Sequence, residues 1–310
     1  MPNAPHPEPP PLPKAAATPP QRRDAPFRGI GFVLLASIFL TSADMVSKLL
    51  TQQIPPLQVS WLRYGTFTLI MLAIVWRGGG ASRLRTQRPM LQFLRGVGVL
   101  ASSVLFVMAL RHMPLADATA TGFVAPLFVT ALSIPILGEA IGWRRWSATL
   151  VGFVGVLIVV RPGGEGFQIA SLLAVGSALS WAFAMIMTRM MSHTESPLAT
   201  LTYSALIGFG LTTLAMPFLW VAVTPTILLM GIFVGVSSTV GHWLIVLAYR
   251  HADASLLAPF SYIQLLWASL FGLVVFAVLP DAWTLVGAVI IAGSGLYTAH
   301  RERIKARLPG

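Results

Sequence analysis

Residues 29–50 read GIGFVLLASIFLTSADMVSKLL, and the only charged side chains in this stretch are Asp44 and Lys48. At 1.5 Å per residue, a helix of this length spans about 33 Å, enough to cross the roughly 30 Å hydrocarbon core of a bilayer. Nine further apolar runs follow with short connections, at residues 56–76, 91–110, 115–137, 146–161, 169–190, 198–220, 226–249, 255–278 and 283–300. We therefore expect an all-α polytopic membrane protein with ten transmembrane helices.

The composition points to the same environment. Of the 310 residues, 55% are hydrophobic and only 10% are charged, and the mean hydropathy is +0.76. Soluble domains carry about 25% charged residues, so this chain lacks the polar surface that a water-soluble fold of its size needs. The chain has no cysteine, which excludes disulfides, thiolate metal sites and thiol catalysis.

The net charge of +11 is interpreted as a sign of membrane topology and not of nucleic-acid binding. With the N terminus inside, 17 of the 21 Lys and Arg residues fall on one side, and that group includes Arg95. Arg111 and Arg161 fall on the other side, and Lys48 and Arg63 lie within apolar runs. Because cytoplasmic loops carry the excess of basic residues, we expect a multi-pass protein of the bacterial inner (plasma) membrane with both termini in the cytoplasm.

The two ends of the chain differ from the apolar region between them. Residues 1–28 hold ten of the 23 prolines, which is typical of a disordered proline-rich segment. Residues 301–310 are basic. We expect two cytoplasmic tails.

The apolar region repeats itself. Residues 47–50 with Pro56 correspond to residues 188–191 with Pro197 at an offset of 141, and further matches follow at smaller offsets. Those matches pair residues 109–112, 116–118 and 125–126 with residues 248–251, 252–254 and 258–259. We expect two five-helix repeats, at residues 29–161 and 169–300. Because five is odd, the second repeat enters the membrane from the opposite side, which gives an inverted-topology repeat with a binding site between the halves.

Several of these stretches resemble the EamA-type drug/metabolite transporter superfamily. Residues 137–146, LGEAIGWRRW, with Arg161-Pro162-Gly163, are similar to the end of the first repeat in that family. Residues 258–262, APFSY, with Leu279-Pro280-Asp281, are similar to the end of the second. The resemblance implies a ten-helix bacterial carrier. One departure is that Phe276-Ala277-Val278 stands where a second repeat glutamate is common.

The charged residues inside the membrane are the first candidates for a site, because such groups are costly in lipid. Asp44 and Lys48 are four residues apart on one helix face, and Arg63 lies at a similar depth. We expect Arg63 or Lys48 to bind a substrate carboxylate and Asp44 to bind an amine or a proton. The alternative is a mutually neutralised structural pair with Lys48 reaching outward. In the family, these three residues resemble the branch for S-adenosylmethionine uptake.

Aromatic, amide and conformational candidates complete the predicted site. Deep polar and aromatic residues suited to a planar or cationic ligand are Trp181, Tyr203, Tyr262, Gln264 and Trp267. Candidates for proton coupling or gating are His242, Glu139, Pro126 and Pro259. The two prolines hold matching places in the repeats and would kink the fourth and ninth helices. Interhelical packing, a hydrogen bond at His242 and a loop salt bridge at Glu139 are the simpler alternatives.

The chain contains no phosphate-binding loop with its lysine, no His-Glu-x-x-His pair and no Gly-x-Ser-x-Gly elbow. We therefore expect a secondary transporter of a small organic solute, working by alternating access, with no enzymatic activity, no cofactor, no metal and no nucleic-acid partner. S-adenosylmethionine is the leading substrate by resemblance. Import or export of another metabolite, such as an amino acid or a riboflavin-like solute, stays open, as do a homodimer and a non-transporting receptor or scaffold.

Overall fold

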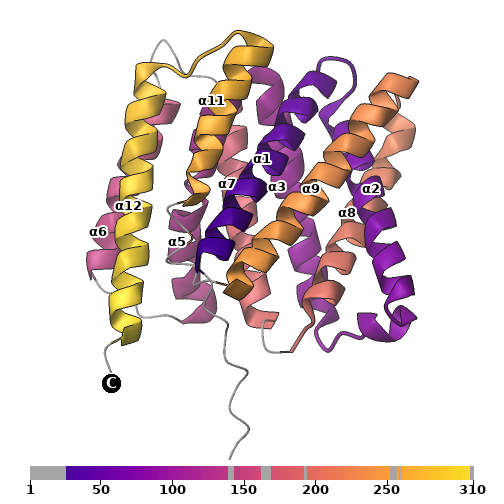
Figure 1. Ribbon diagram of the computed structural model, residues 1–310, viewed down its shortest axis with the longest axis horizontal. Helices are drawn as coiled ribbons and strands as arrows, with labels where there is room; N and C mark the ends of the chain where they lie inside the picture. Colours follow the sequence, from indigo (N-terminus) through magenta and orange to yellow (C-terminus); the bar gives the residue numbers. More distant parts are fainter. Residues whose placement is uncertain are drawn as a thin grey trace, which may run out of the picture.

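A computed structural model describes residues 26–138, 143–161, 169–191, 194–251, 257 and 260–307 of the chain. The regular structure in these ranges is helical throughout (Figure 1). Its helices are α1 (Pro26–Leu50), α2 (Pro56–Arg77), the 3-10 helix η1 (Gly80–Leu84), α3 (Pro89–His112), α4 (Leu115–Gly122), α5 (Ala125–Leu137), α6 (Trp143–Val160), α7 (Ile169–Met191), α8 (Pro197–Leu219), α9 (Pro225–His251), α11 (Ile263–Phe276) and α12 (Ala282–Arg307).

Most of the helices have the length and the apolar composition of membrane-spanning helices. Within the described residues, seven helical spans are long and apolar enough to cross a membrane, and three shorter apolar helices accompany them at Ser147–Val160, Ile263–Phe276 and Ala282–Tyr297. The helices α2, α3, α8 and α9 all begin at a proline. Proline suits the first helical position because its fixed φ is already helical and its missing N–H would have no partner there.

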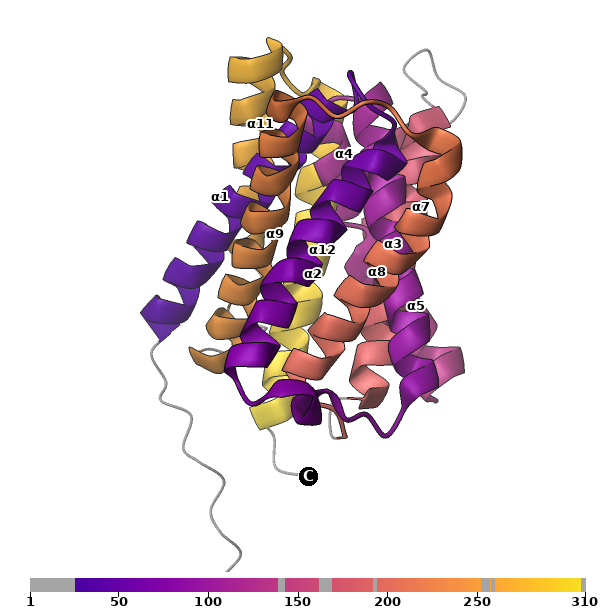
Figure 2. The same ribbon diagram turned by 90° about the vertical axis from the view of Figure 1, so that its right-hand side faces the viewer.

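Helices from the two halves of the chain pack side by side. The helix α1 runs along α9, α3 runs along α7, and α2 packs between α8 and α9 (Figures 1 and 2). The helices α6 and α12 form a pair at one edge of the molecule (Figure 1). The start of α1 and the end of α12 lie at the same end of the bundle, which we name the terminal end, and the α11–α12 connection lies at the opposite, far end (Figures 1 and 2).

The α6–α12 pair depends on two glycines. A Cβ atom on Gly287 would lie 2.6 Å from the carbonyl oxygen of Gly155, and a Cβ on Gly155 would lie 2.9 Å from that of Gly287. These distances leave room only for hydrogen, so the two backbones touch. Small residues permit this close approach between membrane helices.

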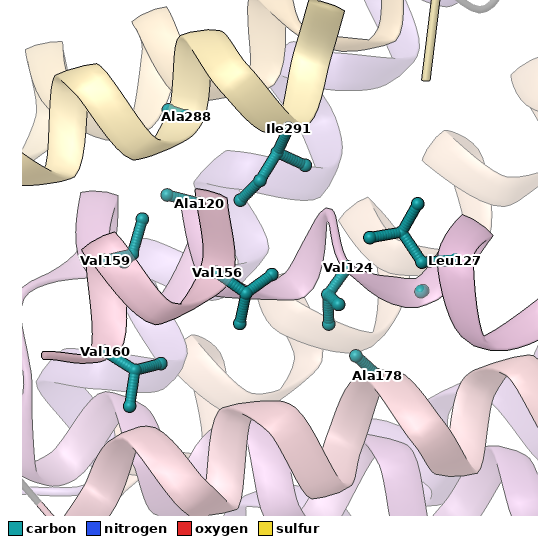
Figure 3. Close-up of a cluster of buried hydrophobic side chains, with 10 residues drawn as sticks. Ala120, Val124, Leu127, Val156, Val159, Val160, Ala178, Ala288 and Ile291 are labelled. Carbon is teal, nitrogen blue, oxygen red and sulfur yellow. The ribbon is translucent and has the colours of Figure 1, made fainter. Parts of the chain in front are cut away.

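The fourth apolar run, expected as one kinked helix over 115–137, is interrupted. The helix α4 ends at Gly122, and α5 begins at Ala125 with Pro126 next to it. Proline has no N–H to bond the carbonyl four residues earlier, so the helical ladder stops there. Buried apolar side chains of α4, α5, α6, α7 and α12 pack around the interruption (Figure 3). The matching Pro259, Glu139 and the proline-rich segment over 1–25 lie outside the described residues, whereas α12 continues to Arg307 into the stretch expected as a tail.

Candidate functional site

A cavity of about 280 Å³ lies between the two halves of the chain. Side chains from α1, α2, α3, α7, α8, α9 and α11, and the interruption between α4 and α5, form its walls. Its polar lining comprises Asp44, Arg63, Tyr64, Arg95, Ser102, Ser103, Thr119, Ser177, Ser204, Ser238, Thr239, His242 and Gln264. Trp181 contributes an aromatic wall, together with Phe67, Phe106 and Phe123. A mostly apolar hollow with a few converging polar groups is typical of a small-molecule site.

Asp44 and Arg63 face this cavity without a protein partner among the described residues. Asp44 is only 8% exposed, yet no hydrogen bond to its carboxylate occurs in that part of the chain, and the same holds for the guanidinium of Arg63. The two charges interact electrostatically, but no pair of their atoms lies within the 4.0 Å of a salt bridge. Charged side chains within membrane helices ordinarily pair with one another or with backbone carbonyls, so this oppositely charged couple is open to a ligand.

Lys48, expected beside Asp44 in the site, lies outside the lining of the central cavity. Its Nζ donates hydrogen bonds to the carbonyl oxygens of Leu110, at 2.6 Å, and Met113, at 2.7 Å. It also lies 5.4 Å from the centre of the Phe276 ring. The last carbonyl oxygens of a helix lack hydrogen-bond partners within the helix. Lys48 donates to those at the end of α3 and so caps this helix. Lys48 therefore lines a separate hollow at the far end and not the central cavity.

Arg95, which sequence analysis assigned to a basic cytoplasmic edge, is buried and lines the cavity. Its Nε donates to Thr188 Oγ1 at 2.8 Å, and its Nη1 donates to the carbonyl oxygen of Thr200 at 3.3 Å and to the hydroxyl of Ser204. The guanidinium thus joins α3 to α7 and α8. The one available sequence signal was its position inside the apolar run 91–110.

Besides Asp44 and Arg63, three of the predicted residues line the cavity: Trp181, His242 and Gln264. The His242 ring lies 6.3 Å from that of Trp181, and its Nδ1 is 2.7 Å from the carbonyl oxygen of Ser238. A carbonyl oxygen can only accept, so Nδ1 carries the proton and Nε2 of the neutral ring is left as an acceptor. The hydroxyl of Ser238, one helical turn before His242, is buried without a hydrogen-bond partner among the described residues.

Tyr203, Tyr262 and Trp267 do not line the cavity. The Tyr203 hydroxyl donates to the carbonyl oxygen of Leu84 at 3.1 Å, and so holds the α2–α3 connection. The Tyr262 ring lies 4.8 Å from that of Phe123 in a tilted arrangement, and Trp267 stacks with Phe271. The sequence predicts how deep these residues lie in the membrane, but it does not predict which side of each helix faces the cavity.

Tyr64 is a cavity residue that the predicted site omitted. It is buried and lies flat against α8, where a Cβ on Gly208 would come within 2.4 Å of its ring. The glycine therefore makes room for the tyrosine in the wall.

Comparison with known proteins identifies the family. Residues 27–161 and residues 168–298 each match the model of the EamA-like transporter family. The S-adenosylmethionine uptake transporter of Rickettsia bellii is 30% identical over 275 residues, which are 89% of this chain and 94% of that protein. The riboflavin transporter of Vibrio cholerae is 31% identical over 287 residues, which are 91% of this chain and 96% of that protein.

A solved crystal structure has the same fold. It is 20% identical, aligns with a TM-score of 0.62, and covers 89% of this chain and 98% of its own. Both halves of the chain thus match one family. The chain belongs to the EamA-like transporter family and is a membrane transporter of small metabolites.

Proposed function

We propose that this transporter works by alternating access through ten membrane-spanning segments arranged as two inverted five-helix repeats. The seven long spans and the three shorter apolar helices together supply ten segments. The contacts between helices are consistent with an exchange of the halves: this exchange turns the α1–α9 contact into the α7–α3 contact and the α2–α9 contact into the α8–α3 contact. The α2–α8 and α6–α12 contacts are each turned into themselves. A two-fold relation of this kind permits the halves to swap conformations across a central site.

The proposed orientation puts the terminal end in the cytoplasm of a bacterium, with the protein in the inner membrane. The α2–α3 connection carries Arg77, Arg83, Arg85 and Arg88 and lies at the terminal end (Figure 1). The far end has Arg111 and Arg161. The asymmetry follows the positive-inside rule.

The proposed site is the couple formed by Asp44 and Arg63, which would bind the amine and the carboxylate of a zwitterionic metabolite. The observation that supports this is the contrast among the charged side chains of the membrane helices. Lys48 and Arg95 donate hydrogen bonds to protein oxygens, whereas Asp44 and Arg63 face the cavity without such bonds. Trp181, Tyr64 and the hydroxyls of Ser103 and Ser238 would enclose the remainder of the solute.

S-adenosylmethionine is the proposed substrate, and uptake is the proposed direction. Its amino-acid portion supplies the amine and the carboxylate, and its sulfonium and adenine suit the aromatic wall formed by Trp181 and its neighbours. The Rickettsia relative named for S-adenosylmethionine uptake supports the same assignment. The Vibrio relative named for riboflavin makes a flavin the second candidate, although a neutral flavin leaves the Asp44–Arg63 couple without a role.

Uptake of labelled S-adenosylmethionine into proteoliposomes tests this proposal. Competitors separate the chemistry: S-adenosylhomocysteine keeps the amino-acid portion, whereas methylthioadenosine and riboflavin lack it. The proposal expects saturable uptake that S-adenosylhomocysteine inhibits at concentrations where methylthioadenosine and riboflavin do not. Uptake that is inhibited by riboflavin alone would contradict the zwitterion site, and a lack of uptake across the panel would contradict transport of this class. A parallel assay with a pH gradient shows whether protons are coupled.

A further inference from the structure

The charged side chains that line the central cavity do not balance. Asp44 is the one acidic residue in the described lining, whereas Arg63 and Arg95 are both basic. With the His242 ring neutral, one acid against two bases gives the lining a net charge of +1, and a proton on His242 would add to this excess. A charge within the membrane is costly unless an opposite charge accompanies it.

The excess positive charge belongs to Arg95. This residue is 7% exposed, and no carboxylate oxygen of the described residues lies within the 4.0 Å of a salt bridge from it. Its Nε and Nη1 atoms donate to Thr188, Thr200 and Ser204 through hydroxyl and carbonyl oxygens. These partners are uncharged, so they hold the guanidinium in place without offsetting its charge.

One edge of this guanidinium is open to the cavity. An arginine has five N–H donors, and the two on Nη2 of Arg95 have no acceptor among the described residues. The Nη2 atom is also not one of the buried polar atoms that lack a partner, so it is accessible from the cavity that Arg95 lines. A guanidinium that is held at one edge and open at the other is suited to bind an anion.

Two hydroxyls of the lining add uncharged donors. Tyr64 interacts electrostatically with Arg95, and its hydroxyl lies beside that of Ser103. A hydrogen bond between two hydroxyls uses one of their two protons, which leaves the other for an anion. The Tyr64 ring packs closely on α8, where a Cβ on Gly208 would come within 2.4 Å of it. This packing fixes the position of the hydroxyl.

We propose that Arg95 and Tyr64 form a second anion-binding site in the cavity, apart from the Asp44–Arg63 couple, and that a small inorganic anion such as chloride occupies it when the solute is S-adenosylmethionine. This solute has two positive groups and one carboxylate, so it raises the net charge of the lined cavity from +1 to +2. A bound chloride returns the charge to +1. The role in uptake rests on the proposed function, whereas the site itself does not. Anion and solute then strengthen the binding of each other, because coupling between two ligands is reciprocal.

The anionic group has two conceivable sources with the same chemistry. It is either a free ion or a second acid group carried by the solute. S-adenosylmethionine has a single carboxylate, which is assigned to Arg63, so the free ion is the source that agrees with the proposed substrate. The experiment below separates the two.

Melting of the purified protein in detergent tests the site without any solute. Gluconate is exchanged for chloride in steps at constant ionic strength. The melting temperature of the wild-type protein should rise with chloride and reach a plateau, because a ligand that binds the folded state stabilises it until the site is full. Arg95→Gln should abolish this saturable rise.

Tyr64→Phe is a second variant, needed because Arg95 also joins three helices and its loss can lower the melting temperature by itself. Phenylalanine keeps the ring against Gly208 and removes only the hydroxyl. A hydrogen bond to a charged group contributes enough for the half-saturating chloride concentration to rise about tenfold.

Two matched controls remove the same chemical groups elsewhere. Thr68→Val takes a buried hydroxyl from the same helix as Tyr64, outside the cavity lining. Arg111→Gln takes a guanidinium from the hollow at the far end. Both should keep the half-saturating chloride concentration of the wild-type protein.

Uptake into proteoliposomes tests the role of the anion. Replacing chloride by gluconate should raise the KM for S-adenosylmethionine about fivefold, at the lower end of the usual coupling between two ligands. S-adenosylhomocysteine lacks the sulfonium charge, so its inhibition constant should change less. A KM that is equal in the two salts would overturn the role of the anion in uptake.

A chloride response without a plateau, or one that both Arg95→Gln and Tyr64→Phe retain, would overturn the site. A melting temperature that aspartate raises and chloride does not would overturn the free ion and assign Arg95 to an acid group of the solute. Failure of the proposed function is distinguishable, because it abolishes uptake of S-adenosylmethionine in both salts and leaves the chloride dependence of melting intact.

Discussion

Replacing Arg63 by alanine should remove the group that binds the substrate carboxylate and leave the other contacts with the substrate in place. Arg63 faces the cavity without a protein hydrogen bond in the described part of the chain, so its donors are free for a ligand. A hydrogen bond to a charged group contributes about 1.5–3 kcal/mol. At 1.4 kcal/mol per tenfold, Arg63→Ala should lower the efficiency of S-adenosylmethionine uptake by about 10- to 100-fold.

The assay is uptake into proteoliposomes, with the decarboxylated analogue of S-adenosylmethionine as a second substrate. The analogue lacks the group that Arg63 is proposed to bind. The wild-type protein should therefore discriminate between the two compounds by about the same 10- to 100-fold, and Arg63→Ala should transport both at similar efficiency. This design is a double-mutant cycle in which one of the changes is made in the ligand.

Two controls sharpen the comparison. Arg111→Ala makes the same chemical change at the far end, outside the central cavity, and should leave discrimination at the wild-type level. Arg63→Lys keeps the positive charge and should keep most of the discrimination. If Arg63→Ala lowers the uptake of both compounds equally, then Arg63 does not bind the carboxylate, and the reasoning from the unpaired couple fails.

Three further predictions concern stability. Lys48→Met leaves two carbonyl oxygens at the end of α3 without their donor and should lower the free energy of unfolding by about 2 kcal/mol. The expected result is a lower melting temperature in detergent with an unchanged KM for uptake. A large rise in KM with a normal melting temperature would instead place Lys48 in the substrate site. Gly287→Ala places a Cβ 2.6 Å from the carbonyl oxygen of Gly155 and should lower the free energy of unfolding by about 2 kcal/mol through overpacking. Gly293→Ala on the same helix meets open space and should keep the wild-type melting temperature. Equal melting temperatures of the two variants would contradict the close contact. Asp281 forms an ion pair with Arg161; partial burial alone would raise the pKa of this carboxyl, but hydrogen bonds from Thr284 and the ion pair lower it in the folded protein. The stability that its charge adds is therefore present above the unfolded pKa of about 3.8 and is lost as the pH falls through the folded pKa. The difference in melting temperature between wild type and Asp281→Asn should stay constant from pH 8 to pH 5, and a steady decline over that range would argue against the ion pair with Arg161.

The boundaries of the membrane helices could be predicted well because a run of apolar residues is a sufficient signal in lipid. The expected run 29–50 is the helix Pro26–Leu50, and 169–190 is Ile169–Met191. The full interruption at residues 123–124 exceeded the predicted kink. Its position beside Pro126 could be predicted from the sequence. Whether the backbone hydrogen bonds of the helix continue through a kink or stop altogether depends on how the neighbouring helices pack.

The candidate site was harder to predict than the fold. Asp44, Arg63 and His242 were predicted because polar groups in lipid are rare, and each lines the cavity. Lys48 and Arg95 lie elsewhere than expected because their hydrogen-bond partners come from distant helices, which the spacing of residues in the sequence does not show. Tyr203 and Trp267 do not line the cavity. A membrane-spanning helix is apolar on all sides, so the sequence pattern that marks the inner face of a soluble helix is weak here.

The most direct test of the central claim is an experimental structure of the protein with S-adenosylmethionine bound. The account predicts density for the ligand in the central cavity, with its carboxylate within hydrogen-bond distance of the Arg63 guanidinium and its amine within hydrogen-bond distance of the Asp44 carboxylate. Ligand density in the hollow beside Lys48, or in the central cavity with both of these side chains turned to protein partners, would contradict it.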